Sequence, residues 1–100
     1  MAKLYISEYV AMPKHLGQLV MAGLEPAVAV QTPVVIGGGS LQSAAFNAET
    51  KFVRLHTDVI CSVAFGTNPT ATANSARLAA NQTEFFGVNP GDKVAVITNT

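Results

Sequence analysis

The sequence predicts an all-β fold: a small antiparallel β-sandwich or jelly-roll-like domain with an extended N-terminal arm. Apolar and polar residues alternate through residues 51–65 and 83–98, and a period of two is typical of strands that bury one face. Turn-forming residues recur roughly every 8–12 residues, as they do in sandwiches of short strands. No strong helical pattern competes with this interpretation.

Residues 3–10 are the first predicted strand, in which Leu4, Ile6 and Val10 share one face. Residues 11–25 have a looser pattern, because a proline and two glycines interrupt it. Four apolar residues in this segment have helical spacing, so a short helix and an irregular loop or arm stay as alternatives. These four residues are Leu16, Leu19, Val20 and Leu24.

Two short segments rich in β-branched residues, at residues 27–31 and 34–36, are the next predicted strands. Pro33 lies between them, which suits an edge strand or a bend. Three glycines and a serine follow at residues 37–40. This run would cradle a phosphate only if it joined a strand to a helix, and residues 41–47 are too short for that helix and contain no lysine. A flexible hinge is the favoured interpretation.

The second half of the chain has the clearest strand patterns. Val53 and Leu55 face one way, and Cys61 shares a face with the apolar residues two positions before and after it. Residues 66–74 begin with a glycine and contain no large apolar side chain, which is typical of an exposed loop. Residues 89–92 (Asn-Pro-Gly-Asp) predict a tight turn. The predicted strands cover residues 51–57, 59–65, 77–80 (a short strand or a connector), 83–88 and 93–98.

The predicted hinge divides the chain into an N-terminal arm at residues 1–40 and a β-sandwich body at residues 41–100, within one compact domain. Residues 1–36 contain three prolines, which favour extended chain, and many apolar residues that need a partner surface. We therefore expect the arm to bind a neighbouring protein by adding a strand to a sheet edge. The alternative is that these residues complete the sandwich of the body itself.

The charge of the chain is low and balanced. Six Lys and Arg residues offset six Asp and Glu residues, and charged residues make up 12% of the chain, about half of the roughly 25% usual for soluble domains. A neutral chain has no field to attract nucleic acid or an anionic membrane, so neither is an expected partner. Residues 26–48 carry no charge, but prolines, glutamines and glycines interrupt them, which argues against a transmembrane helix. A neutral surface predicts contacts with other proteins, including copies of the same chain.

The sequence predicts no catalytic, cofactor-binding or metal-binding residue, no cofactor, and no enzymatic activity. Cys61, His56 and Asp58 are close in sequence, but Cys61 lies on an apolar strand face and His56 points the other way, so a buried, inert thiol is expected. His15 and Asp92 complete the set of candidate metal ligands, which have no spacing typical of a metal site.

Four aromatic residues raise a carbohydrate-binding alternative, because aromatic faces pack against sugar rings. The chain has two tyrosines, five phenylalanines and no tryptophan, and a sandwich of this size is expected to bury most of them. Burial is therefore the favoured interpretation. The four residues are Tyr5, Tyr9, Phe85 and Phe86.

Residues 45–98 contain four segments in the order KFVRLHT at 51–57, CSVAFGTNPTA at 61–71, RLAA at 77–80 and EFFGV at 84–88. In the style and order of these segments the chain resembles small virion proteins of tailed bacteriophages, closest to capsid decoration (cement) proteins. The resemblance implies a β-rich protein, often a homotrimer, that is made in the host cytoplasm. It would then bind and stabilise the major capsid protein lattice on the exterior of the virion. Another phage structural component, such as a head-fibre base or tail part, and a carbohydrate-binding β-sandwich module stay as alternatives.

Overall fold

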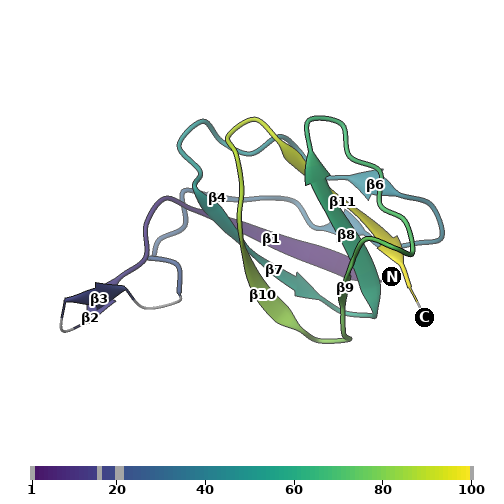
Figure 1. Cartoon of the computed structure of the whole chain (residues 1–100), viewed down its shortest axis with the longest axis horizontal. Helices are drawn as coiled ribbons and strands as arrows, with labels where there is room; N and C mark the ends of the chain where they lie inside the picture. The colour runs from purple at the N-terminus through teal and green to yellow at the C-terminus, as the bar shows by residue number, and fades with distance from the viewer. Residues whose placement is uncertain (1, 16, 20–21, 100) are drawn as a thin grey trace.

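The computed structural model describes residues 2–15, 17–19 and 22–99 of the chain (Figure 1). Over these residues the chain is all-β, and two antiparallel sheets pack face to face, which confirms the predicted β-sandwich. None of the described segments forms a helix that is long and apolar enough to cross a membrane.

The first sheet has five strands and the second has four. The first sheet runs in the order β10 (Thr83–Gly87), β7 (Phe52–Thr57), β1 (Lys3–Tyr9) and β4 (Ala29–Val30), with β5 (Val34–Val35) also paired to β1. The second sheet runs in the order β6 (Leu41–Gln42), β11 (Lys93–Thr98), β8 (Cys61–Gly66) and β9 (Ala76–Leu78). A separate hairpin is formed by β2 (Lys14–His15) and β3 (Gln18–Leu19).

The core lies between the two sheets and is built from alternate residues of each strand. The register pairs Ile6 with Leu55, so the even-numbered residues of β1 and the odd-numbered residues of β7 face the second sheet. From the second sheet, Cys61 and Val63 face inward, as their alternation predicts. The core cluster comprises Leu4, Ile6, Val34, Ile36, Phe46, Val53, Leu55, Cys61, Val63, Leu78, Val94 and Val96.

Most of the predicted arm lies inside the sandwich. Strand β1 is central in the first sheet, with β7 on one side and β4 and β5 on the other. Leu4 and Ile6 of β1 and Ile36 after β5 belong to the core. Residues 3–9 and 29–36 therefore follow the alternative in which they complete the fold, because the apolar face of β1 finds its partner surface within the same chain.

The glycine run at residues 37–40 connects β5 in the first sheet to β6 in the second and differs from the predicted hinge. The backbone N–H of Thr98 donates to the carbonyl of Gly37 at 2.9 Å, and the backbone N–H of Ala71 donates to Ser40 Oγ at 2.9 Å. These two hydrogen bonds tie both ends of the run to the body, so the run is a crossover with a defined path.

The described residues of the segment 10–25, which we call the projecting segment, leave the sandwich and carry the β2–β3 hairpin at one end of the long axis of the molecule (Figure 1). The molecule measures 43 × 25 × 23 Å along its principal axes. The described part of this segment follows the loop-or-arm alternative and not the helix, because Leu19 belongs to β3 and Leu24 is exposed. The other two residues of the helical spacing, Leu16 and Val20, lie outside the described residues.

The loop between β8 and β9, residues 67–75, is held by side chains from elsewhere. Gln42 Nε2 donates to the carbonyl of Pro69 at 2.8 Å, and Asn99 Nδ2 donates to the carbonyl of Ala73 at 3.2 Å. Pro69 is also buried, although most of the loop is exposed as predicted. The loop is therefore fastened to β6 and to the end of β11.

Candidate binding surfaces

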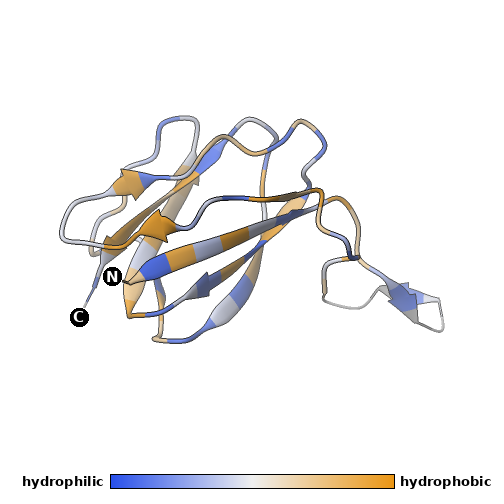
Figure 2. Ribbon diagram, turned by 180° about the vertical axis from the view of Figure 1, so that it is seen from behind, coloured by the Kyte–Doolittle hydropathy of each residue, from blue (hydrophilic) through white to orange (hydrophobic). Residues whose placement is uncertain are grey.

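The outer face of the first sheet carries a mixed group of aromatic, cationic and polar side chains. The register places Tyr5 opposite His56 and Arg54 opposite both Ser7 and Phe85. These residues alternate with the core residues, so their side chains point away from the second sheet. Figure 2 views the molecule from behind and shows the alternation of hydrophilic and hydrophobic residues along the strands of this sheet.

Three rings form an aromatic cluster on this face next to the projecting segment. Tyr9 stacks on Phe52 with ring centroids 5.5 Å apart, and Phe85 lies 6.5 Å from Tyr9 and 6.0 Å from Phe52. The Tyr9 hydroxyl donates to Glu25 Oε2 at 2.7 Å, and Gly23 packs against the ring, so Tyr9 is only 3% exposed. Burial, together with the hydrogen bond to Glu25, raises the pKa of Tyr9 above its ordinary value of 10.0.

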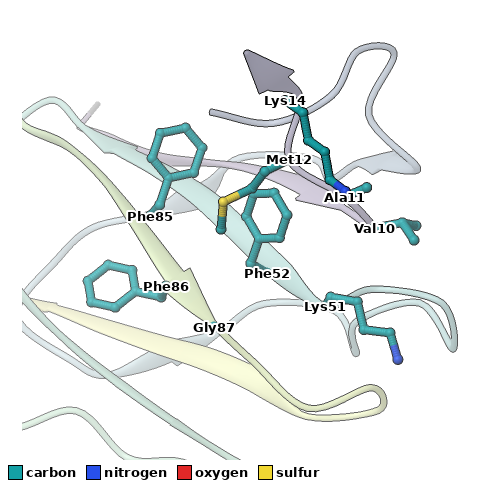
Figure 3. A pocket seen from close by; sticks show the side chains of 9 residues that line it. All are labelled: Val10, Ala11, Met12, Lys14, Lys51, Phe52, Phe85, Phe86 and Gly87. Atoms are coloured by element: carbon teal, nitrogen blue, oxygen red, sulfur yellow. The ribbon is translucent and has the colours of Figure 1, made fainter. Parts of the chain in front are cut away.

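Phe52 and Phe85 of the aromatic cluster, together with Phe86, line a groove that we call the edge groove, because it runs beside the edge strand β10. Its volume is about 540 Å³. Figure 3 shows Met12 of the projecting segment beside Phe52 and Phe85, with Lys14 and Lys51 at the rim. The groove is thus an apolar trough with two exposed ammonium groups at its border.

A second groove, which we call the face groove, lies farther along the same sheet. It has a volume of about 590 Å³ and includes Tyr5, Val30, Arg54 and His56 in its lining. The ring centroids of Tyr5 and His56 are 6.2 Å apart, and Tyr5 is 41% exposed. His56 Nδ1 lies 2.8 Å from Thr83 Oγ1, which orients the imidazole ring. This groove combines one exposed aromatic face with hydrogen-bonding side chains.

The four aromatic residues of the carbohydrate-binding alternative do not share one platform. Tyr9 and Phe85 belong to the aromatic cluster, while Tyr5 lies in the face groove. Phe86 points to the opposite side of β10 and packs on Phe65, with ring centroids 5.0 Å apart. The carbohydrate-binding alternative now depends on Tyr5 and its neighbours in the face groove.

The structure does not bring Cys61, His56 and Asp58 together. Cys61 is buried in the core and its Sγ donates to Thr57 Oγ1 at 3.4 Å, whereas His56 lies on the outer face of the other sheet. Asp58 Oδ2 accepts the backbone N–H of Lys3 at 3.0 Å. Burial raises the pKa of the Cys61 thiol, with the hydrogen bond to Thr57 acting in the opposite direction. The Cys61 thiol therefore lies apart from both His56 and Asp58, the nearby residues in the sequence that could act as an acid or a base.

Metal ligands do not cluster in the part of the chain that the structure describes, where no three His, Cys, Asp or Glu side chains are arranged to hold a metal ion. Asp92 lies in the turn before β11, far along the chain from His56 and Asp58 in β7 and the turn that follows it. The glycine run leads into strand β6 and not into a helix, so the phosphate-loop geometry does not form there.

Glu8 is a buried residue that the strand pattern overlooked. It is 2% exposed and lies on the inner face of the first sheet. Its Oε1 accepts the backbone N–H of Asn47 at 2.7 Å and the hydroxyl of Thr50 at 2.6 Å, and its Oε2 accepts Gln31 Nε2 at 2.9 Å. The sequence held one signal for this burial: Glu8 is two residues after Ile6 and four after Leu4, so strand alternation places all three on the core face. Glu8 is a structural anchor that joins β1 to two connecting segments.

No protein-family model, curated protein sequence or solved structure matches this chain.

Proposed function

We propose that the chain is a structural component of a tailed-bacteriophage virion, a capsid decoration (cement) protein that binds the lattice of the major capsid protein from outside. The observation that carries the proposal is the segment at residues 10–25, which projects from a sandwich that has its own core. Val10 is 43% exposed and Leu24 is 53% exposed on this segment. Large apolar side chains on an exposed projection are typical of surfaces that bind another protein.

The composition supports a place in a multi-copy assembly. Only 12% of the residues are charged, and Val30 on the outer face of the first sheet is 75% exposed. A protein that stays monomeric usually covers its surface with more charge than this. The resemblance of residues 45–98 to virion proteins is the reason for proposing a phage capsid as this assembly. The proposed homotrimer rests on the same resemblance.

The proposal is tested by binding to expanded capsids of the tailed phage that encodes the chain. The hairpin closes at its base through the hydrogen bond from Leu24 N–H to Ala11 O at 2.9 Å, so residues 13–22 can be replaced by an Asn-Gly turn above that bond. We expect the natural chain to sediment with the capsids and to occupy regular lattice positions in electron micrographs. The shortened variant should keep its buried Cys61 protected and lose capsid binding.

Two results would overturn the proposal. Natural chain that stays in the supernatant with expanded capsids would remove the decoration function. Detection of the chain only at the tail or at head fibres of intact virions would favour the alternative phage components over a lattice protein.

A carbohydrate-binding module is the second candidate, because the face groove places the exposed Tyr5 ring beside Arg54 and His56. An aromatic ring that stacks on a sugar, next to donors for its hydroxyl groups, is the usual chemistry of such sites. A glycan array with the natural chain and a Tyr5→Ala variant tests it: binding that the variant loses would support this candidate.

A further inference from the structure

The longest free sheet edge among the described strands is β10. Strands β4, β5 and β6 have two residues each, and β9 has three, whereas β10 has five. Edge strands are commonly protected by lysine, proline or very short length. Strand β10 has the sequence Thr-Glu-Phe-Phe-Gly and therefore contains neither lysine nor proline.

The backbone groups that β10 presents at this edge follow from its pairing with β7. At one end of the pair the N–H of Thr57 donates to the carbonyl of Gln82 at 3.2 Å, and at the other end the N–H of Val88 donates to the carbonyl of Lys51 at 3.1 Å. Hydrogen-bonded residues alternate in an antiparallel ladder, so Thr83, Phe85 and Gly87 point their N–H and C=O groups away from β7. No strand pairs with this side of β10 in the described ranges.

The edge groove lies beside these free backbone groups. Phe85 and Gly87 line it together with Phe52 and Met12, so a strand added to β10 would place every second side chain on the same face as Phe85, at the border of this apolar groove. Lys14 and Lys51 are exposed at its rim, and its lining includes no carboxylate. The charge of the groove is therefore complementary to an acidic chain.

We propose that β10 and the edge groove bind an extended segment of a partner protein, with apolar residues at alternate positions and an acidic residue at the end that lies beside Gly87. The segment pairs its backbone with Thr83, Phe85 and Gly87. Its acidic end lies near Lys51, which is next to Val88 in the β7–β10 pairing, and near Lys14. The proposal goes beyond the decoration function, because the site selects a peptide chemistry and does not depend on which particle carries the peptide. Gly87 lies outside the projecting segment, so loss of peptide binding in a Gly87 variant would leave capsid attachment through the hairpin untouched.

Position 87 offers a matched pair of variants for the backbone contact. A Cβ added to Gly87 meets no atom within 4 Å, so Gly87→Ala keeps the N–H and fits without strain. Gly87→Pro removes the outward N–H of this position. It leaves all hydrogen bonds between β10 and β7 in place, because the N–H of residue 87 points away from β7. The charge contact is tested by a Lys14→Glu and Lys51→Glu double variant, with Lys3→Glu at the far end of β1 as its control.

The probe is a fluorescein-labelled peptide, Glu-Val-Thr-Val-Thr-Val-Glu, measured by fluorescence anisotropy against the same peptide with lysine at both ends. We expect the acidic peptide to bind the natural chain more tightly than the lysine peptide. Gly87→Pro should weaken binding about tenfold while Gly87→Ala leaves it within about twofold. The double charge variant should reverse the preference between the two peptides, and Lys3→Glu should preserve it.

Several outcomes would overturn the proposal. These are no binding of the acidic peptide at about 1 mM, equal binding of both peptides, or equal effects of the proline and alanine variants at position 87. Sedimentation of all variants is measured in parallel. If Gly87→Pro converts an oligomer to a monomer and no peptide binds, the edge belongs to a second copy of the chain and the proposal is wrong. The double charge variant keeps the test decisive if Gly87→Pro fails to fold.

Discussion

Single side chains hold the connections of this sandwich together, and Glu8 is the clearest case. Its two oxygens accept three hydrogen bonds inside the protein, from Asn47, Thr50 and Gln31. Gln31 in turn binds the backbone of Ala44, donating to its carbonyl at 3.2 Å and accepting its N–H at 3.1 Å. The carboxyl group therefore links the first sheet to the segment that passes between the sheets.

We expect Glu8→Gln to lower the free energy of unfolding by about 1–3 kcal/mol, because an amide in this position turns an N–H₂ group toward another donor. Gln31 cannot turn its own amide to compensate without losing both hydrogen bonds to Ala44. Urea denaturation followed by circular dichroism measures the change. The control is Glu49→Gln, an exposed carboxyl in the neighbouring turn, which should change stability by no more than about 0.5 kcal/mol. Equal midpoints for the two variants would contradict the anchoring role of Glu8.

Cys61 should react with a thiol reagent more than about a thousandfold more slowly in the native protein than in urea, because reaction requires an opening that costs about 5–15 kcal/mol. Its side chain is 0% exposed, and burial raises its pKa above the ordinary value of 9.0, which lowers the thiolate fraction at neutral pH. The same raised pKa makes the folded state lose stability as pH rises past about 9, because the unfolded chain releases the proton first. Rapid labelling of the folded chain at pH 7 would show that the thiol is accessible.

At the scale of elements, the contact of Gly23 with the ring of Tyr9 fixes the base of the projecting hairpin on the sandwich. Gly23 packs against the ring of Tyr9. The same ring stacks on Phe52, and the Tyr9 hydroxyl donates a hydrogen bond to Glu25. A side chain at position 23 would occupy the space of this ring. The return segment of the hairpin is thus seated on the aromatic cluster at a position that only glycine permits.

We expect Gly23→Ala to destabilise the protein by about 1–3 kcal/mol, since the added methyl group overlaps the Tyr9 ring and the ring is held between other aromatic side chains. Gly38→Ala is the matched control, because a Cβ at Gly38 meets no atom within 4 Å. Thermal melting and the near-ultraviolet circular dichroism of the tyrosine measure the effect. Unchanged tyrosine signals in Gly23→Ala would mean that the segment does not rest on the ring.

Elements with strict alternation were predictable, and elements that depend on distant partners were not. Residues 51–57 and 93–98 carry their pattern locally, so both strands were predicted from the sequence, as was the shared face of Val53 and Leu55. Strand β6 has only two residues, and its existence depends on the pairing of Gln42 with Ala95 more than fifty positions away. The edge groove was missed for the same reason, because no local pattern records that Met12 and Phe85 line the same groove.

At the scale of the whole molecule, the central place of β1 makes the N-terminal third indispensable. A fragment of residues 37–100 should fail to fold, because it lacks Leu4 and Ile6 in the core and leaves β7 without its neighbour. Circular dichroism and the dispersion of a proton NMR spectrum measure this. A folded fragment with native-like protection of Cys61 would show that residues 1–36 are an arm after all.

The natural chain should self-associate at roughly tens of micromolar, as its low charge and the 75% exposure of Val30 indicate. The resemblance to decoration proteins implies a trimer. We expect Val30→Lys to shift the sedimentation coefficient toward the monomer, and Gly87→Pro to leave it unchanged. A monomeric natural chain at this concentration would contradict the expectation for the free protein.

Ala2 and Asn99 line a single apolar hollow. The start of β1 and the end of β11 lie at the end of the molecule away from the hairpin (Figure 1). Chain ends that lie this close tolerate circular permutation. A short linker from residue 99 to residue 2, with new ends opened between β2 and β3, would keep every strand pair of the sandwich. Such a permutant would turn the closed hairpin into two free tails, and would thereby separate what the loop contributes by its shape from what its residues contribute by their chemistry.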